Sequence, residues 1–362
     1  MNYPKQFYRG IATLTGCVIG AGILGIPYVV QKSGFWTGML VLVMIGVAML
    51  LVHLMVGDIA RASKKFSQLT GYAHDLLGRK WMLLMLVSMI IGINGAMVAY
   101  TIGVSESLAG MFGGSSAWWG VLFYVIMSVI LLGGVDVLGK SEVWMESIKF
   151  TVLALLLTVL FFAPQFSTSP FTGFSLSNLL IPYGVILFAY IGTAAVPELC
   201  EEMRSCRKFT RRAIVIGSLL PMLVYFLFTA AVIGVSKSAT TEISTIGISA
   251  ILGARAAFAF HLFAILAMSS SFAALGFALK ETFWKDVGLS HLSAWSLTLA
   301  VPAVLLLVGV NSFVKTLELT GAFAGGITCL LVIVMHAKLR RGSILMYLLL
   351  ASLFIAGMVY QL

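Results

Sequence analysis

The chain has 362 residues, of which 60% are hydrophobic and only 10% are charged, and its formal net charge is +10. Soluble domains carry about 25% charged residues, so this composition excludes an ordinary water-soluble domain and indicates an integral membrane protein. Apolar stretches of about 20 residues, each sufficient to cross a ~30 Å hydrocarbon core, recur along the whole length. The first stretch is too long and too interrupted by glycine for a cleavable signal peptide.

The apolar stretches predict an all-α protein with eleven transmembrane helices. In chain order, we expect them at about 8–31, 34–60, 81–110, 116–135, 143–163, 176–200, 210–235, 253–279, 292–310, 312–337 and 343–361.

The basic residues report orientation rather than binding to nucleic acid. If the N-terminus is cytoplasmic, 18 of the 23 basic residues lie on the inner side, as the positive-inside rule requires. We therefore predict a multi-pass protein of the cell membrane with its N-terminus in the cytoplasm and its C-terminus outside. The inner basic residues are Lys5, Arg9, Arg61, Lys64, Lys65, Arg79, Lys80, Lys140, Arg204, Arg207, Lys208, Arg211, Arg212, Lys280, Lys285, Lys338, Arg340 and Arg341.

Two of the expected spans contain a similar interruption. The first reads Gly20-Ala-Gly-Ile-Leu-Gly-Ile-Pro-Tyr28 and the sixth reads Tyr190-Ile-Gly-Thr-Ala-Ala-Val-Pro-Glu198, with a glycine five residues before a proline in both. Glycine and proline weaken a helix and free backbone N–H and C=O groups, which in a bilayer must line a cavity or bind a ligand. Matched broken helices indicate the binding site of a secondary transporter. The alternative is a pair of proline kinks satisfied by neighbouring helices.

The positions of the breaks predict how the chain is organised. We expect one transmembrane domain over 1–362, in which a first repeat at about 8–163 and a second at about 176–337 have opposite orientations. The span at about 343–361 is then an addition outside the repeat. The outer stretch 236–252 is either a re-entrant gate or an ordinary surface loop.

Few polar side chains fall within the spans. Lys149 in the fifth span stands out, because an ionisable group at such a depth costs about 2.5–3.5 kcal/mol and normally faces a cavity. The four cysteines lack metal-ligand spacing. We expect no metal site, and we expect His53 and His261, each alone in a span, to be packing residues.

The interrupted first span resembles the signature of amino-acid permeases in the amino acid–polyamine–organocation superfamily, especially the hydroxy/aromatic amino-acid permease and amino acid/auxin permease branches. Phe188-Ala-Tyr-Ile-Gly192, the Glu201-Glu202 pair followed by Arg211-Arg212-Ala-Ile, and Ser270-Ser-Phe-x-x-Leu-Gly276 are similar to patterns of the same superfamily. The resemblance covers essentially the whole chain. It implies a leucine-transporter-type fold of two five-helix inverted repeats, with broken helices 1 and 6.

The resemblance also implies a substrate site between the two breaks. Freed N–H groups at the positive end of a half-helix suit a carboxylate, freed carbonyls suit an α-ammonium group, and a zwitterion needs no charged side chain there. A hydroxyl of the third span is a further candidate contact, with aromatic packing as its alternative. The expected substrate-binding residues are Gly20, Ala21, Gly22, Ile23, Tyr100, Phe188, Ala189, Tyr190 and Gly192.

Two arrangements compete for the coupling ion, and no other cofactor is expected. Sodium-coupled relatives bind the ion between the first break and hydroxyls of the eighth span, which here are Gly20, Ile23, Ser270 and Ser271. Some proton-coupled relatives place a lysine ammonium of the fifth span in that position, which here is Lys149. An ammonium would repel sodium, so the two are exclusive, and we favour protons.

The predicted function is therefore secondary active transport of an amino acid, aromatic or otherwise neutral, by proton symport. Sodium symport and a non-transporting membrane sensor with the same fold are alternatives. We find no paired carboxylates or histidine–carboxylate sets that would indicate an intramembrane enzyme, and no continuous polar lining typical of a channel. The expected partners are a small-molecule amino acid and the lipid bilayer, with neither nucleic acid nor an obligate protein partner.

Overall fold

The computed structural model describes residues 5–63, 66–133, 142–340 and 342–362, and every regular element in those ranges is a helix. The α-helices are α1 Lys5–Val18, α2 Ile26–Ser33, α3 Phe35–Ala62, α4 Leu69–Leu77, α5 Arg79–Phe112, α6 Ser116–Leu132, α7 Glu142–Phe161, α8 Tyr183–Tyr190, α9 Ala195–Glu202, α10 Thr210–Ser236, α11 Ser244–Leu252, α12 Ala254–Glu281, α13 His291–Leu307, α14 Phe313–Leu319, α15 Gly326–Leu339 and α16 Ile344–Tyr360. Short 3₁₀ or π-helical turns are η1 Ala21–Leu24, η3 Leu176–Asn178, η4 Arg204–Phe209, η5 Lys237–Ala239, η6 Thr282–Asp286 and η7 Thr320–Gly325.

The number of spans agrees with the sequence. Among the described residues, six helical segments are long and apolar enough to cross a membrane, and the bent pair Lys5–Val18 and Ala21–Ser33 makes a seventh. Four shorter apolar helices account for the remaining expected spans: Ser116–Leu132, Ile148–Phe161, His291–Leu307 and Ile344–Tyr360. The all-α class and the approximate span boundaries are therefore confirmed.

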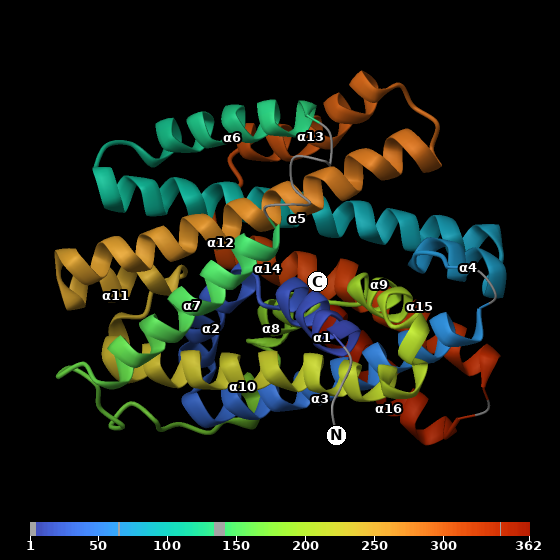
Figure 1. Ribbon diagram of the computed structural model, residues 1–362. Helices are drawn as coiled ribbons and strands as arrows, with labels where there is room; N and C mark the ends of the chain where they lie inside the picture. The colour runs from blue at the N-terminus through green and yellow to red at the C-terminus, as the bar shows by residue number, and fades with distance from the viewer. Residues whose placement is uncertain (1–4, 64–65, 134–141, 341) are drawn as a thin grey trace.

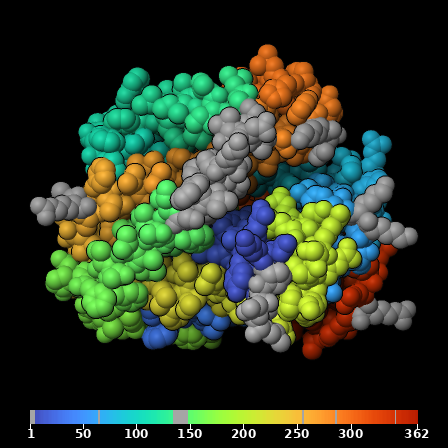
Figure 2. Space-filling model, viewed as in Figure 1, coloured from blue at the N-terminus to red at the C-terminus, as the bar shows by residue number. Residues whose placement is uncertain are grey.

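The helices form two adjoining groups. α5 packs along α12, with α6 and α13 covering their far side, whereas α1, α3 and α10 pack together in the other half of the molecule (Figure 1). In the space-filling view, α1 reaches the surface at the centre of this face, between α7 and α9 (Figure 2). The first broken helix therefore lies where the two groups meet.

A proline in α10 shows how neighbouring helices satisfy a freed backbone group. Pro221 has no N–H to donate to the carbonyl of Gly217, four residues earlier. The Thr15 hydroxyl of α1 lies 3.4 Å from that carbonyl oxygen and donates to it instead. Gly217 also allows close packing, since a Cβ there would lie 3.1 Å from side-chain carbons of Leu14. The hydrogen bond from Thr15 and the close packing at Gly217 therefore help to hold α1 against α10.

Two segments between the expected spans contain short helices. The stretch 61–80 includes α4, which packs against α5, and the stretch 236–252 includes α11, which packs against α12. Both helices have only nine residues, too few to span a bilayer. Length-based span prediction passes over such short helices, because tertiary packing supplies most of their stability.

One of the basic residues that we expect on the inner side is buried rather than solvated. Lys280, near the end of α12, is 3% exposed, and its ammonium donates to the carbonyl oxygens of Leu131 at 2.6 Å and Gly133 at 3.1 Å. Both carbonyls belong to the C-terminal end of α6, where a cation is favourable. Lys280, which is one of the basic residues used to predict orientation, therefore also caps the C-terminal end of α6.

Candidate functional site

The first span is broken as expected. α1 ends at Val18, Gly20 is extended at φ −114° and ψ −151°, and a 3₁₀ turn precedes α2. The two halves differ in direction by 48°. Pro27 lies in the first turn of α2, where its missing N–H costs nothing. The glycines and the proline thus end one half-helix and begin the next.

The sixth span is broken at the corresponding place. α8 ends at Tyr190, Ile191 is extended at φ −64° and ψ 108°, and α9 begins at Ala195 with Pro197 in its first turn. The break therefore frees carbonyls at the C-terminal end of α8 and N–H groups at the start of α9.

The two breaks are in direct contact. A Cβ built on Gly22 would lie 2.7 Å from both Cα and Cβ of Ala189, closer than van der Waals contact permits. Gly192 lies against Val18 and Leu14 of α1, with no room for a Cβ beside Val18. Gly192 therefore allows the two broken helices to approach each other. Its contact with the substrate stays a prediction.

Side chains from the third and eighth spans also reach this region. A Cβ on Gly20 would lie 3.3 Å from Ser271 Oγ of α12, and the Tyr100 hydroxyl of α5 faces the same serine. The Tyr100 ring also packs edge-on against Phe188 of α8, with 6.5 Å between the ring centres. The structure thus brings together the predicted residues of spans 1, 3, 6 and 8.

Tyr225 of α10 is a residue of this region that the sequence analysis missed. Its hydroxyl oxygen lies 2.5 Å from the carbonyl oxygen of Val18 and 2.9 Å from that of Ala189. One hydroxyl thereby contacts a carbonyl at the end of each half-helix, α1 and α8, although it has one proton to donate. The Val18 carbonyl also accepts from the N–H of Gly20 at 2.8 Å. An isolated tyrosine in an apolar span carries no sequence signal of this kind, because the two carbonyls belong to other spans.

The predicted coupling residues have different surroundings. The Ser270 hydroxyl donates to the carbonyl of Ala267 in its own helix at 3.0 Å, whereas Ser271 faces the first break. Lys149 is 4% exposed on α7, which packs against α12 and α10, and its ammonium lies 5.7 Å from the centre of the Phe150 ring. The role of Lys149 in coupling stays a prediction.

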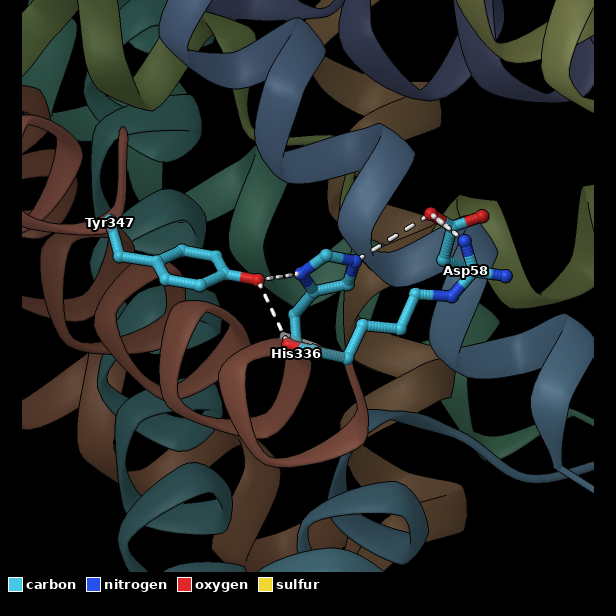
Figure 3. Close-up of polar contacts among 4 residues, drawn as sticks. Asp58, His336 and Tyr347 are labelled. Carbon is cyan, nitrogen blue, oxygen red and sulfur yellow. Dashed lines mark hydrogen bonds and ion pairs between the residues drawn. The ribbon is translucent and has the colours of Figure 1, made fainter. Parts of the chain in front are cut away.

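A polar cluster at the ends of α3 and α15 joins three helices (Figure 3). His336 of α15 lies with Nε2 3.5 Å from Asp58 Oδ2 of α3 and with Nδ1 2.8 Å from the Tyr347 hydroxyl of α16. Arg340 approaches the same carboxylate oxygen at 3.7 Å. The cluster connects the last helix to α3 and α15, and sequence spacing did not indicate it.

Within the described ranges, no group of three or more His, Cys, Asp or Glu residues is arranged to hold a metal ion.

A multi-pass bundle with two discontinuous helices that meet at their breaks has the architecture of secondary transporters. The sequence profile of the tryptophan/tyrosine permease family matches residues 4–356, and the chain belongs to this family. The resemblance inferred from the motifs is therefore confirmed.

Curated relatives and solved structures agree with this assignment. "Amino acid transporter AVT1H" of Arabidopsis thaliana is 23% identical over 58% of this chain and 51% of its own length. "Glutamine transporter 2" of Aliivibrio fischeri is 19% identical over 65% and 62%, respectively. The chain thus spans about half to less than two thirds of the length of these relatives.

Two solved transporters share the fold. MhsT, solved in complex with L-phenylalanine, has a TM-score of 0.68 at 16% identity, covering 97% of this chain and 96% of that one. Mhp1 in an inward-facing conformation has a TM-score of 0.64 at 15% identity, covering 98% and 88%. The leucine-transporter-type fold is therefore confirmed.

Proposed function

We propose that this chain is a secondary transporter that carries aromatic amino acids across the cell membrane by alternating access. The observation that supports this most directly is the contact between the two helix breaks at Gly22 and Ala189, with Tyr100 and Ser271 beside them. The description of the family supports tryptophan or tyrosine as the substrate. We propose a carrier without enzymatic activity, built as inverted repeats at about 8–163 and 176–337.

The backbone chemistry of the breaks suits a zwitterion. The N-terminal end of a half-helix favours a carboxylate and its C-terminal end favours a cation. We assign the substrate carboxylate to the N–H groups of Gly20, Ala21, Gly22 and Ile23, and the ammonium to the carbonyl end of α8 at Phe188, Ala189 and Tyr190. The edge-on pair of Tyr100 and Phe188 offers aromatic surface to an aromatic side chain.

We propose coupling to protons through Lys149. Burial of this lysine supports the idea, because a permanent charge in an apolar span is costly unless the group lies in a polar cavity or releases its proton. The alternative is sodium held by Gly20, Ile23 and the hydroxyls of Ser270 and Ser271. Of these two hydroxyls, only that of Ser271 faces the first break.

Transport by purified protein in liposomes tests both parts of the proposal. We expect counterflow of labelled L-tryptophan or L-tyrosine, and accumulation driven by an inward proton gradient without sodium. Lys149→Ala should abolish the gradient-driven accumulation and retain counterflow.

Each part can fail separately. Binding without counterflow would indicate a sensor and contradict the transporter proposal. Strict sodium dependence that is lost in Ser271→Ala and kept in Lys149→Ala would contradict proton coupling alone.

A further inference from the structure

His53 lies in the membrane-spanning part of α3 and is 1% exposed. Its Nδ1 atom lies 3.0 Å from the hydroxyl oxygen of Ser218 on α10. One ring nitrogen is therefore engaged in a hydrogen bond between two neighbouring helices.

The other ring nitrogen is directed at the break of the sixth span. Among the described residues, His53 Nε2 is buried without a hydrogen-bond partner. A Cβ built on Gly192 would lie 3.4 Å from Nε2, an ordinary van der Waals distance, so this ring nitrogen lies directly beside the backbone of the break. A buried polar atom without a partner costs free energy, and this one lies beside backbone that has left the helical hydrogen-bond pattern.

The neighbouring helices carry both neutral and charged titratable groups. Tyr190 at the C-terminal end of α8 and Tyr225 of α10 lie side by side, with 5.1 Å between their ring centres. The Cys329 thiol of α15 contacts Met49, one turn from His53. The other titratable groups on helices packed against α3 are Tyr28 and Lys32 of α2, Tyr183 of α8, Glu198, Cys200, Glu201 and Glu202 of α9, Arg211 and Arg212 of α10, and His336 and Lys338 of α15, while α3 itself carries Asp58 and Arg61.

We propose that His53 is a proton-binding site of this carrier, in addition to Lys149, and that its protonation state controls the break of the sixth span. The protonated ring donates through Nδ1–H to Ser218 Oγ and through Nε2–H to a carbonyl freed between α8 and α9. Loss of the proton leaves Nε2 without a partner, the arrangement seen here. The proton enters from water on one side and leaves to water on the other, so no other reactant is required.

This role links the proton to the substrate and rests on the proposed function. The substrate ammonium is assigned to the carbonyl end of α8, which is the same break that the protonated ring contacts. Two ligands that act on one break change each other's affinity by the same factor. For symport, this factor favours joint binding: the substrate carboxylate offsets the repulsion between the two cations at the break, so the amino acid raises the proton affinity of His53.

The test is a histidine NMR titration of the purified full-length protein in lipid nanodiscs, with and without L-tryptophan. The protein contains five histidines, and His53→Gln identifies the signal of interest. We expect the His53 signal to titrate between pH 3.5 and pH 8 and its midpoint to rise by about one pH unit with tryptophan, equivalent to about tenfold coupling.

His261 of α12 provides the matched control. It is also buried and has a ring nitrogen without a partner in the described structure, but it lies against Gly110 rather than a helix break. Its midpoint should not respond to tryptophan. Ser218→Ala should lower the midpoint of His53 by removing the acceptor of Nδ1–H, which provides a second variant if His53→Gln does not fold.

The proposal is overturned if His53 stays in one protonation state across this pH range. It is also overturned if the titration midpoint of His53 is the same with and without bound tryptophan. Counterflow of labelled tryptophan in the wild-type protein reports separately on the proposed function. A titrating His53 in a protein without counterflow supports the proton site and contradicts transport.

Discussion

Gly22 and Ala189 meet so closely across the two helix breaks that a methyl group on Gly22 would lie 2.7 Å from both Cα and Cβ of Ala189. The residues are far apart in the chain and belong to spans 1 and 6. Their contact makes the two breaks one structural feature, because neither half-helix can shift at this point without moving the other.

We predict that Gly22→Ala weakens substrate binding about tenfold or more, while the protein still inserts into the membrane. The added methyl forces the breaks apart, and overpacking of this kind typically costs about 1–3 kcal/mol. Binding of labelled tryptophan to purified protein measures the effect. Gly92→Ala is the control, since its Cβ would meet only the Ala324 Cβ at 3.3 Å. Wild-type affinity in Gly22→Ala would move the substrate site elsewhere.

Tyr225→Phe should lower both stability and transport. Without the hydroxyl, the buried carbonyls of Val18 and Ala189 lose their shared contact, at an expected cost of about 1–3 kcal/mol in the free energy of unfolding. Because both carbonyls lie at the breaks, we also expect a higher KM for uptake.

Tyr183→Phe provides the comparison for Tyr225→Phe, because the Tyr183 hydroxyl is likewise buried and donates to a backbone carbonyl, that of Phe354 on α16. It should alter thermal stability and leave KM unchanged. Equal KM values for both variants and the wild type would limit Tyr225 to a structural role.

Cys17 should report occupancy of the site by thiol labelling. It is exposed near the end of α1 and close to Tyr100, whereas Cys329 is buried. In a Cys200→Ser, Cys206→Ser background, we expect N-ethylmaleimide to label Cys17 and not Cys329, and saturating tryptophan to slow the reaction severalfold. A labelling rate that is the same with and without bound tryptophan would place the substrate away from the first break.

The topology follows from the basic residues and the number of spans. A reporter that is active only in the cytoplasm should be bright when fused after Lys285 and silent when fused after Leu362. The expected contrast rests on positive-inside orientation with an odd number of crossings. A bright fusion after Leu362 would mean that the number of crossings is even.

The sequence by itself determined the class, the spans and the positions of the two breaks. Each depends on local properties: the length of an apolar stretch decides whether it crosses a bilayer, and glycine and proline decide where a helix is interrupted. The superfamily motif lies in one such interruption, which is why the family assignment and the residues around Gly22 and Ala189 could be predicted without a structure.

Only the tertiary structure decided which side chains from distant spans meet. Tyr225 contacts two breaks, His53 pairs with Ser218 and points at Gly192, and His336 joins Asp58 to Tyr347. In an apolar span these residues look like packing residues, because their partners are backbone groups or side chains many residues away. Such contacts follow from how whole helices pack and rotate against one another, and hydrophobic periodicity in a membrane protein carries little of that information, since lipid-facing and buried surfaces are both apolar.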